Sequence, residues 1–434
     1  MAIACDVLII GGGLTGVAAA RRAVAAGLST VIAADGPGSL PFTSGAIDLL
    51  AVYPTETKRN RSRPWEALSE LIEHEPDHPY GRVGLAGVRR SIKEFTGYLE
   101  RSPLAYTERE AQNSHLITAA GTIKPTYAVP GSMRANAAAF AQRLPTLILG
   151  FCDLVDFSPE QVVGNLRDRW PGLRAERIAL TDCFDRDRRL TPAALLDVFE
   201  RPAFRAAVAE RIRPLLGQAR FLGLPAVLGI EGVAEVLADL QQRLGVEVFE
   251  IPLLSPSPPG IRLARQLERD LLAAGVVYRV GAPVVRLDSA GRRITAAVQQ
   301  GRGRAEEIRA RAVVLASGRF FGGGLLAERD LVREPLLDLP VRAPASRDDW
   351  HMNTFLGAPG HPLNRVGIRV DRRLRPLGAD GDALYENLYA AGAILADHDW
   401  VREKSGAGIS VATGVAAVDS FLAGAGRSDP GARP

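Results

Sequence analysis

Three glycines near the N-terminus have the spacing of a phosphate-binding turn. They are Gly11, Gly13 and Gly16, and they lie between an apolar run at 7–10 and an alanine-rich stretch at 17–26. Between a buried strand and a helix, the first glycine allows the tight bend, the second lets the backbone approach a phosphate, and the third lets the helix pack on the sheet. Free N–H groups at the helix N-terminus attract the negative charge. The pattern predicts a nucleotide or flavin site; the alternative is a glycine-rich turn without a ligand.

The acid that usually ends the second strand of such a unit, and binds the ribose diol, is displaced in this sequence. Its expected position is Ala34, directly after the strand predicted at 30–33, and Asp35 follows one residue later. Two interpretations stay open. Either Asp35 reaches the ribose after a small shift of the chain, or the flavin has no adenosine ribose, which favours FMN over FAD.

Two further glycine-bearing segments follow predicted strands in the C-terminal half. The apolar strand 312–316 ends in Ser317 and Gly318, and the segment 386–393 contains Gly392. Small residues at a strand end let the backbone come close to a cofactor. Ordinary packing of a strand and a turn would also explain each segment alone. The three motifs in this order are much more specific for a flavoprotein than any one of them.

A helix of small residues is predicted from Gly406 to about residue 422, with Gly408 in its first turn. Its N-terminus would face the pyrimidine edge of a flavin, where reduction places negative charge that a helix dipole stabilises. Ala393 stands where many flavoproteins have an acid for the ribityl hydroxyls. The alternative for this helix is a core element packed through its small residues.

These motifs need a parallel sheet that brings the strand ends together. The rest of the C-terminal half supplies a helix and short strands that lead into the strand at 312–316, and they are predicted at 261–274, 276–280, 284–288, 294–300 and 306–309. Continuous apolar runs are typical of buried parallel strands. We therefore predict an α/β protein with a Rossmann-like FAD/NAD(P)-binding flavoprotein fold and an inserted α/β domain.

The flavin-binding domain is predicted to be discontinuous. It comprises residues 1–50 plus 260–434, and residues 51–259 form the inserted cap or partner domain. Within the insertion, Ser158-Pro159 and Thr191-Pro192 are strong helix starts, because a hydroxyl caps the helix and proline suits its first position. The polar residues 424–434 are predicted to be a flexible tail.

Composition argues against several other classes of protein. The net charge is +4, but acids and bases are interleaved and no basic run reads as a nucleic-acid patch. Three cysteines, Cys5, Cys152 and Cys183, lack the spacing of a zinc or iron–sulfur site, so no metal is predicted. No uninterrupted apolar run of membrane-spanning length is evident, so membrane contact is expected only through a partner.

Several segments beyond the glycine motifs resemble a known family, the B subunits of anaerobic glycerol-3-phosphate dehydrogenase. The similarity covers nearly the whole chain and is weakest at about 93–222. The segments that carry it are PFTSGAIDLL (41–50), HPY (78–80), LPAVLG (224–229), PPGIRLARQ (258–266), VLASGRFFGGGLLAER (314–329), REP (333–335) and NLYAAG (387–392).

The resemblance implies one component of a multi-subunit dehydrogenase. The family oxidises sn-glycerol 3-phosphate to dihydroxyacetone phosphate and passes the electrons to the membrane quinone pool. The B subunit is associated with FMN, with FAD as the alternative here. It pairs with an FAD-containing A subunit, while a separate iron–sulfur C subunit is the membrane anchor of the pair. The expected location is therefore cytoplasmic, on the inner face of the membrane through a partner.

Such a reaction needs cations for the substrate phosphate and a base for the hydroxyl proton. Arginine suits phosphate because its planar fork binds oxygens in pairs. We predict Arg319 and Arg329 as substrate or flavin-phosphate contacts; the alternative is ordinary ion pairing with Glu328 or Glu334. His351 is the predicted base, unless the A subunit performs the oxidation and this chain relays electrons.

By position, Thr43, Ser44 and Gly45 would approach flavin N5, and the alternative for them is helix capping and tight packing. Two other functions stay open for the whole chain. One is a free-standing flavin oxidoreductase of the fumarate-reductase type. The other is a non-catalytic scaffold or electron relay for the catalytic subunit.

Overall fold

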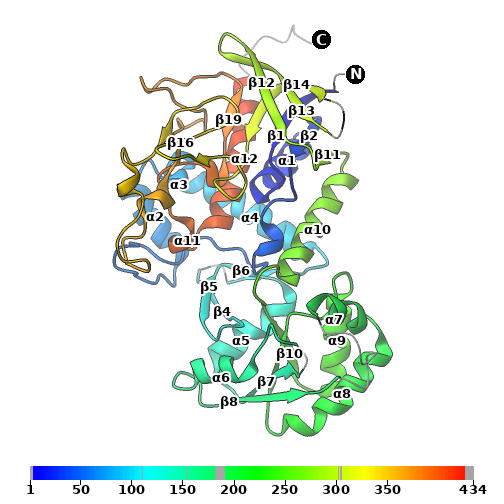
Figure 1. The fold of residues 1–434 in the computed structure, drawn as a ribbon. Coiled ribbons are helices and arrows are strands. Elements are labelled where there is room, and N and C mark those ends of the chain that lie inside the picture. Colours follow the sequence, from blue (N-terminus) through cyan, green and yellow to red (C-terminus); the bar gives the residue numbers. More distant parts are fainter. Residues whose placement is uncertain are drawn as a thin grey trace. The chain divides into compact units, whose positions relative to one another are not determined.

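The computed structural model describes residues 3–109, 111–152, 154–180, 191–301, 303 and 305–425 (Figure 1). Cys183 and residues 426–434 of the predicted tail lie outside the described residues. The chain divides into two compact units. The first comprises Met1–Ser39, Asp48–Phe95 and Gln266–Pro434, and the second comprises Leu40–Ile47 and Thr96–Arg265.

Residues 40–47 and 260–265, predicted in the flavin-binding domain, belong to the second unit, and the largest departure from the predicted domain boundaries is over residues 51–95. The sequence places them in the inserted domain, but they belong to the first unit. The physical reason is the burial of Tyr80, whose hydroxyl donates hydrogen bonds to the backbone oxygens of Leu49, at 2.6 Å, and Ser405, at 3.3 Å. The helix that contains Tyr80 therefore packs with the C-terminal part of the chain.

A sheet with five parallel strands forms the centre of the first unit. Its order is β11-β2-β1-β14, and β19 pairs with β14 on the far side. Ile10 in β1 lies opposite Ala33 in β2 and Leu315 in β14, and Leu315 lies opposite Ala390 in β19. The carboxyl ends of four strands therefore meet at one edge of the sheet.

The predicted meander is present on the β14 side. β14 (Ala305–Leu315) is one long strand where the sequence predicted two, and it pairs antiparallel with β13, which pairs antiparallel with β12. The other strands and helices of this unit are β1 (Ile3–Ile10), α1 (Leu14–Ala25), β2 (Thr30–Ala34), α2 (Pro64–His74), α3 (Pro79–Val83), β11 (Val277–Val280), β12 (Val284–Ala290), β13 (Arg293–Gln300), β15 (Leu326–Ala327), β16 (Val332–Arg333), β17 (Val341–Arg342), β18 (Gly367–Ile368), β19 (Leu388–Ala390), α11 (Trp400–Glu403) and α12 (Gly406–Ala425).

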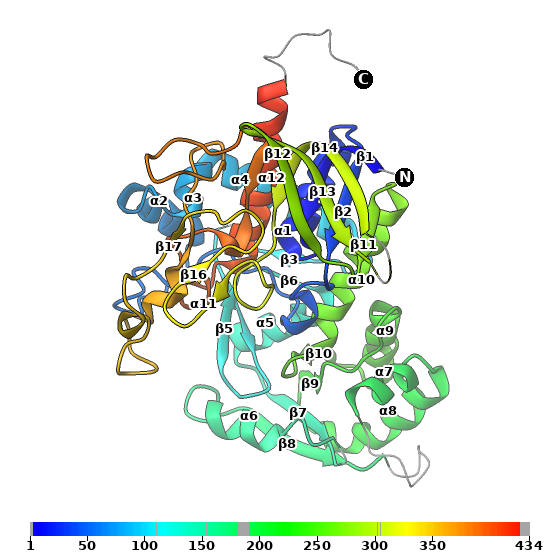
Figure 2. The ribbon, with the colours of Figure 1, turned by 45° about the horizontal axis from the view of Figure 1, so that its top comes forward.

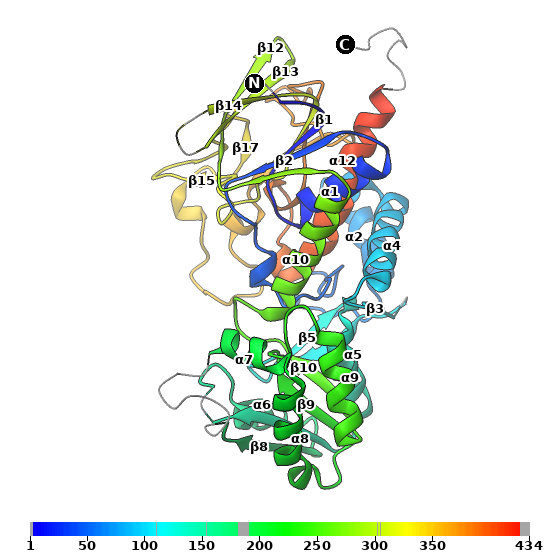
Figure 3. The same ribbon diagram turned by 90° about the vertical axis from the view of Figure 1, so that its right-hand side faces the viewer.

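α12 packs against α1 in the first unit (Figure 3). By length and composition alone, the stretch Gly406–Gly424 is apolar enough to cross a membrane, which the sequence patterns above did not indicate. However, 56% of that stretch is buried inside the structure. Partial burial against another helix is the arrangement of a core helix, so this finding is weak evidence for a membrane span.

The second unit contains a four-stranded parallel sheet with the order β10-β9-β7-β8 (Figure 2). Both predicted helix starts are confirmed: the hydroxyl of Ser158 accepts a hydrogen bond from Gln161 N, and that of Thr191 accepts one from Ala194 N, each at 3.2 Å. The strands and helices of the unit are β3 (Thr107–Glu108), β4 (Ser114–Ile117), β5 (Ile123–Thr126), β6 (Ala128–Val129), α5 (Arg134–Gln142), β7 (Thr146–Phe151), α6 (Pro159–Leu166), β8 (Leu173–Ile178), α7 (Pro192–Phe199), α8 (Pro202–Leu216), β9 (Phe221–Pro225), α9 (Val233–Leu244) and β10 (Glu247–Ile251).

Two helices contribute residues to both units. They are α4 (Leu85–Arg101) and α10 (Pro258–Ala273). The second unit has a hydrophobic core of its own, built on the buried strands β7, β9 and β10. Each unit therefore has a buried sheet and is described separately below.

Candidate flavin site in the first unit

The turn between β1 and α1 has the geometry that its glycine spacing predicts. Gly11 has a φ of +123°, and a Cβ built on it would lie 2.2 Å from the backbone oxygen of Ala316. A Cβ on Gly16 would lie 2.0 Å from the oxygen of Gly11. No real Cβ approaches so closely, so both positions require glycine. A Cβ on Gly13 would meet nothing within 4 Å, so the turn has open space at this residue.

The chain that leaves β2 passes close to the same turn. A Cβ on Gly38 would lie 2.6 Å from the Cα of Gly13. Ala34 is buried at the end of β2, whereas Asp35 is exposed. Asp35 therefore lies on the short connection between the strand and the turn. Its contact with a ribose stays a prediction.

The end of β14 carries a polar group without a partner. The Ser317 hydroxyl is buried, and it has no hydrogen-bond partner among the described residues. Gly318 has a φ of +76°, and a Cβ on Gly324 would lie 2.0 Å from the Gly318 oxygen. A buried hydroxyl without a partner costs free energy, so a ligand that forms a hydrogen bond with Ser317 would stabilise this strand end.

The end of β19 lies against the first turn of α1. Gly392 has a φ of +80°, and a Cβ on it would lie 2.1 Å from Oγ1 of Thr15. Its backbone N–H donates to Oγ1 of Thr413 in α12, at 2.9 Å. Gly11 meets the end of β14 and Gly392 meets α1, so the three glycine-bearing strand ends converge as predicted. Open space at Gly13 and the unpartnered hydroxyl of Ser317 fit a bound flavin nucleotide.

The start of α12 differs in part from its predicted role. A Cβ on Gly408 would lie 2.1 Å from the hydroxyl of Tyr80, and the N–H of Gly408 donates to the oxygen of Asp48 at 2.8 Å. Gly408 thus serves close packing, which was the alternative interpretation. Gly406 lies near Trp400, with 3.1 Å from its ideal Cβ position to the ring. Contact of either glycine with a flavin stays a prediction.

A buried carboxylate that the sequence motifs did not reveal precedes this helix. Oε2 of Glu403 accepts hydrogen bonds from Ser405 Oγ, at 2.7 Å, and from His78 Nε2, at 3.3 Å. Nδ1 of His78 accepts from the N–H of Tyr80, so Nε2 carries the proton. Burial would raise the pKa of Glu403, but its interactions with the neighbouring groups, above all with His78, lower this pKa to about 2.

The only sequence signals for this cluster were the His-Pro-Tyr segment and a glutamate just before a glycine-rich helix start. His78 also caps α3, since its ring accepts the N–H of Tyr80 at 3.1 Å. His78 and Glu403 are 325 residues apart in the chain. Their pairing fixes the chain segment that enters α12.

Arg319, a predicted phosphate contact, lies on the carboxyl edge of the sheet but binds the chain itself. Its Nε donates to the oxygen of Ala393, and its Nη2 to the oxygen of Leu395, each at 3.0 Å. Its Nη1 donates to the oxygen of Asn364. These bonds occupy much of the guanidinium, so they do not support its role as a phosphate clamp.

The other two predicted catalytic residues lie in exposed segments of the first unit. Arg329 is exposed, and its backbone oxygen accepts a hydrogen bond from Arg347 at 2.9 Å. His351 is also exposed, and its ring lies 5.3 Å from that of His361. Nearby, Arg333 forms an ion pair with Glu328. The catalytic roles of Arg329 and His351 stay predictions.

Thr43, Ser44 and Gly45 belong to the second unit. The hydroxyl of Thr43 donates to the oxygen of Leu40 at 2.8 Å and accepts the N–H of Gly45 at 3.2 Å. A Cβ on Gly45 would lie 2.9 Å from Pro259. These contacts are those of a cap and a tightly packed turn, and the approach of the three residues to flavin N5 stays a prediction.

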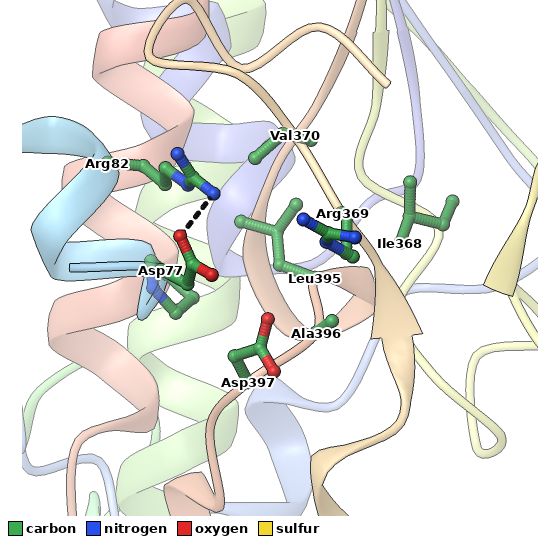
Figure 4. Close-up of a pocket in the computed structure, with 9 residues that line it drawn as sticks. Asp77, Arg82, Ile368, Arg369, Val370, Leu395, Ala396 and Asp397 are labelled. Atoms are coloured by element: carbon green, nitrogen blue, oxygen red, sulfur yellow. Dashed lines mark hydrogen bonds and ion pairs between the residues drawn. The ribbon is translucent and has the colours of Figure 1, made fainter. Parts of the chain in front are cut away.

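The first unit also has a small pocket, with a volume of about 10 Å³, that involves none of the predicted site residues (Figure 4). Its acids are already paired. Asp77 binds Arg82 and Asp397 binds Arg342, each at 2.6 Å. Pockets for small molecules usually have a volume of about 300–1,000 Å³. The size and the internal ion pairs make this pocket a weaker candidate than the strand ends.

Comparison with protein families defines the class of the chain. Residues 6–409 match the family model described as FAD binding domain. The match begins in β1 and ends in the first turn of α12, so it includes all three converging strand ends. Together with the parallel strand order, it establishes an α/β FAD-binding fold.

More specifically, the chain belongs to the family of B subunits of anaerobic glycerol-3-phosphate dehydrogenase. It is 34% identical to a probable member from Halobacterium salinarum, over 96% of this chain and 97% of that protein. It is 32% identical to the Yersinia pseudotuberculosis protein, over 96% and 98%. Among solved structures it is similar to 3-ketosteroid delta1-dehydrogenase from Sterolibacterium denitrificans, with 14% identity, a TM-score of 0.44, and coverage of 97% and 100%.

Proposed function

We propose that this chain is a flavin-binding subunit of an anaerobic glycerol-3-phosphate dehydrogenase. One observation carries the proposal: the glycine-bearing ends of β1, β14 and β19 meet at one sheet edge in a chain of this family. The proposed reaction oxidises sn-glycerol 3-phosphate to dihydroxyacetone phosphate, and the electrons pass to the quinone pool. A bound flavin would supply the hydride acceptor.

The residues of the strand ends have distinct proposed roles. The open backbone at Gly13 and the N-terminus of α1 bind the flavin phosphate. The Ser317 hydroxyl gains a hydrogen bond from or to the cofactor. Gly11 and Gly392 keep the neighbouring backbones close, because no side chain fits at either position. These residues bind and orient the flavin rather than move a proton.

FAD and FMN have different support. The family description favours FAD, because the matching model is an FAD binding domain. The buried Ala34 at the end of β2 favours FMN, because it replaces the acid that usually holds the adenosine ribose. If the cofactor is FAD, the exposed carboxylate of Asp35 is the nearest acid in the chain to that position.

The proposed assembly follows from the names of the relatives. They are B subunits, so we propose partners corresponding to an FAD-containing A subunit, together with an iron–sulfur C subunit that anchors the complex. We also propose that the chain lies at the cytoplasmic face of the membrane through these partners, with α12 as a core helix.

A second candidate is an electron relay in which the partner subunit oxidises the substrate. Arg319 favours it, because the arginine nearest the strand ends donates to the backbone oxygens of Ala393, Asn364 and Leu395. Mixing glycerol 3-phosphate with the isolated flavin-loaded chain distinguishes the two. Bleaching of the flavin without partner subunits supports direct oxidation; bleaching only in the complex supports the relay.

The flavin proposal is tested with the purified chain. Chromatography of the extracted cofactor identifies FAD or FMN. Gly13→Glu places a carboxylate at the phosphate position, and we expect it to remove the flavin while the protein stays folded, since no atom lies within 4 Å of the new Cβ. Gly164→Glu is the matched control, because its Cβ also meets nothing within 4 Å but lies in α6 of the second unit. Equal flavin content in the two variants would contradict the proposal.

A further inference from the structure

A largely buried guanidinium lies at the carboxyl ends of β14 and β19. Arg319 follows Gly318 directly, and its Nε binds the oxygen of Ala393, the residue after Gly392. Both neighbouring glycines belong to the converging strand ends. Among the described residues, the hydrogen bonds of Arg319 go to backbone oxygens and to the ring of His398 rather than to a carboxylate.

The nearest negative charges are bound to other groups. Asp399 accepts a hydrogen bond from Asn364 at 2.9 Å and lies 3.4 Å from Nε of Arg402. Glu403 is held by His78 and Ser405. Burial lowers the pKa of Arg319 to about 10, and the charges of Asp399 and Glu403 oppose this shift. Arg319 therefore remains a cation at neutral pH, without a dedicated counter-ion.

His398 contributes no second charge at this place. It is fully buried, its Nδ1 lies 3.3 Å from the oxygen of Ala396 and 3.5 Å from Nη2 of Arg319, and its Nε2 has no partner among the described residues. Burial and the neighbouring Arg319 hold the pKa of His398 well below its usual range. The imidazole is therefore neutral, and Arg319 is the fixed positive charge of this edge.

We propose that the fixed charge of Arg319 raises the reduction potential of the flavin bound at these strand ends. The inference rests on the proposed function. Two-electron reduction leaves negative charge on the flavin ring, whereas the oxidised ring is neutral. A cation in a poorly solvated site stabilises the reduced form more than the oxidised form. Arginine suits this role because it stays protonated and its donors hold the surrounding carbonyl groups.

The competing explanation is a purely structural brace, in which Arg319 only holds the segment from Ala393 to His398. Charge and bracing are separated by two substitutions. Arg319→Lys keeps the charge but loses the planar fork, and Arg319→Gln keeps some hydrogen bonding but loses the charge. Both are measured in the flavin-loaded chain within its complex, by spectroscopic titration of the flavin midpoint potential.

We expect Arg319→Gln to lower the equilibrium ratio of reduced to oxidised flavin about tenfold. For a two-electron couple, this corresponds to a midpoint potential about 30 mV lower. Arg319→Lys should stay within about threefold of wild type, although the protein unfolds more easily. Arg309→Gln is the control, because Arg309 is an exposed arginine within β14, the strand that precedes Arg319. It should leave the potential unchanged.

A third variant keeps the inference testable if Arg319→Gln does not fold. Asp399→Asn keeps a side-chain oxygen, which in the wild-type structure accepts the backbone N–H of Arg402 at 3.2 Å. The substitution removes a negative charge that acts on Arg319. The flavin midpoint potential should then rise, whereas in Arg319→Gln it should fall. A wild-type potential in Arg319→Gln, or an unchanged or lower potential in Asp399→Asn, overturns the inference. A wild-type chain that binds no flavin overturns the proposed function instead, and this is seen before any variant is made.

Discussion

Two strand-to-helix turns, one in each unit, show how the same local chemistry reaches opposite outcomes. The β1–α1 turn of the first unit has open space at Gly13. The β9–α9 turn of the second unit is filled by its own chain. There, one carboxylate oxygen of Glu200 accepts the N–H groups of Ile230, Glu231 and Gly232 at 2.9, 3.0 and 3.3 Å.

Both turns follow a buried parallel strand and lead into a helix, and anions bind favourably to N–H groups close to a helix N-terminus. In the second unit Glu200 supplies the anion, and the backbone N–H groups lower its pKa although partial burial would raise it. In the first unit Asp35, the acid that follows β2, is exposed. A glycine-rich turn therefore indicates a ligand only when the protein does not already satisfy its donors.

The largest expected effect concerns the buried ion pair that holds the β9–α9 turn in place. Glu250 is fully buried, accepts the N–H of Leu228 at 3.0 Å and binds Arg262 through two hydrogen bonds. Glu250→Ala leaves Arg262 buried without its counter-ion, and we expect the free energy of unfolding to fall by about 3–5 kcal/mol. Chemical denaturation measures it. Arg265→Ala, which breaks an exposed ion pair with Glu231, should change stability by less than about 1 kcal/mol. Equal losses in the two variants would contradict the comparison.

The next effect compares the glycines of the two turns. Gly11 and Gly229 both have positive φ, +123° and +88°. A Cβ on Gly11 would meet the backbone oxygen of Ala316 at 2.2 Å, whereas one on Gly229 would meet the flexible side chain of Glu200 at 2.9 Å. We expect Gly11→Ala to cost about 3 kcal/mol and Gly229→Ala about 1–2 kcal/mol. Thermal unfolding of both variants measures the two losses of stability. A larger loss in Gly229→Ala than in Gly11→Ala would contradict the comparison of the two turns.

The smallest effect concerns Glu200 itself. Glu200→Ala removes the acceptor of three N–H groups, and we expect a loss of about 1 kcal/mol near neutral pH, reduced by solvent screening because the residue is exposed. The pKa of Glu200 is lowered in the folded state. Its stabilising contribution is therefore present above the unfolded pKa of about 4.3 and is lost as the pH falls through the folded pKa. The stability curves of wild type and variant should converge in acid; parallel curves would show that the carboxylate charge is not involved.

Local signals were enough to predict the parts of the site that lie close together in sequence. The apolar run, the glycine spacing and the alanine-rich stretch predicted β1, the turn and α1, and all are confirmed. Hydroxyl-proline pairs predicted the starts of α6 and α7 in the second unit. These features depend on backbone conformation and short-range capping, which the residues themselves determine.

Features that depend on distant partners could not be predicted. Tyr80 joins the first unit because it packs against Gly408, more than 300 residues away in the chain. The same holds for Arg319, whose hydrogen-bond acceptors are backbone oxygens such as that of Ala393, 74 positions away. A backbone acceptor leaves no trace in residue identity, so the pattern of side-chain types suggested only a phosphate or a carboxylate as the partner of Arg319. The apolar composition of α12 alone likewise did not distinguish a membrane span from a core helix, because that distinction depends on the burial of the helix in the folded chain.

The pairing of β1 with β14 has a consequence for how the protein is made. Leu315, the neighbour of Ile10 in β14, is synthesised about 300 residues after Ile10. Gly392, at the end of β19, is synthesised later still. At a translation rate of about 10 residues per second, the nascent N-terminal strand spends roughly half a minute without β14 as its partner. The three converging strand ends are therefore complete only late in synthesis, and a premature stop anywhere before residue 388 removes β19 from the finished chain.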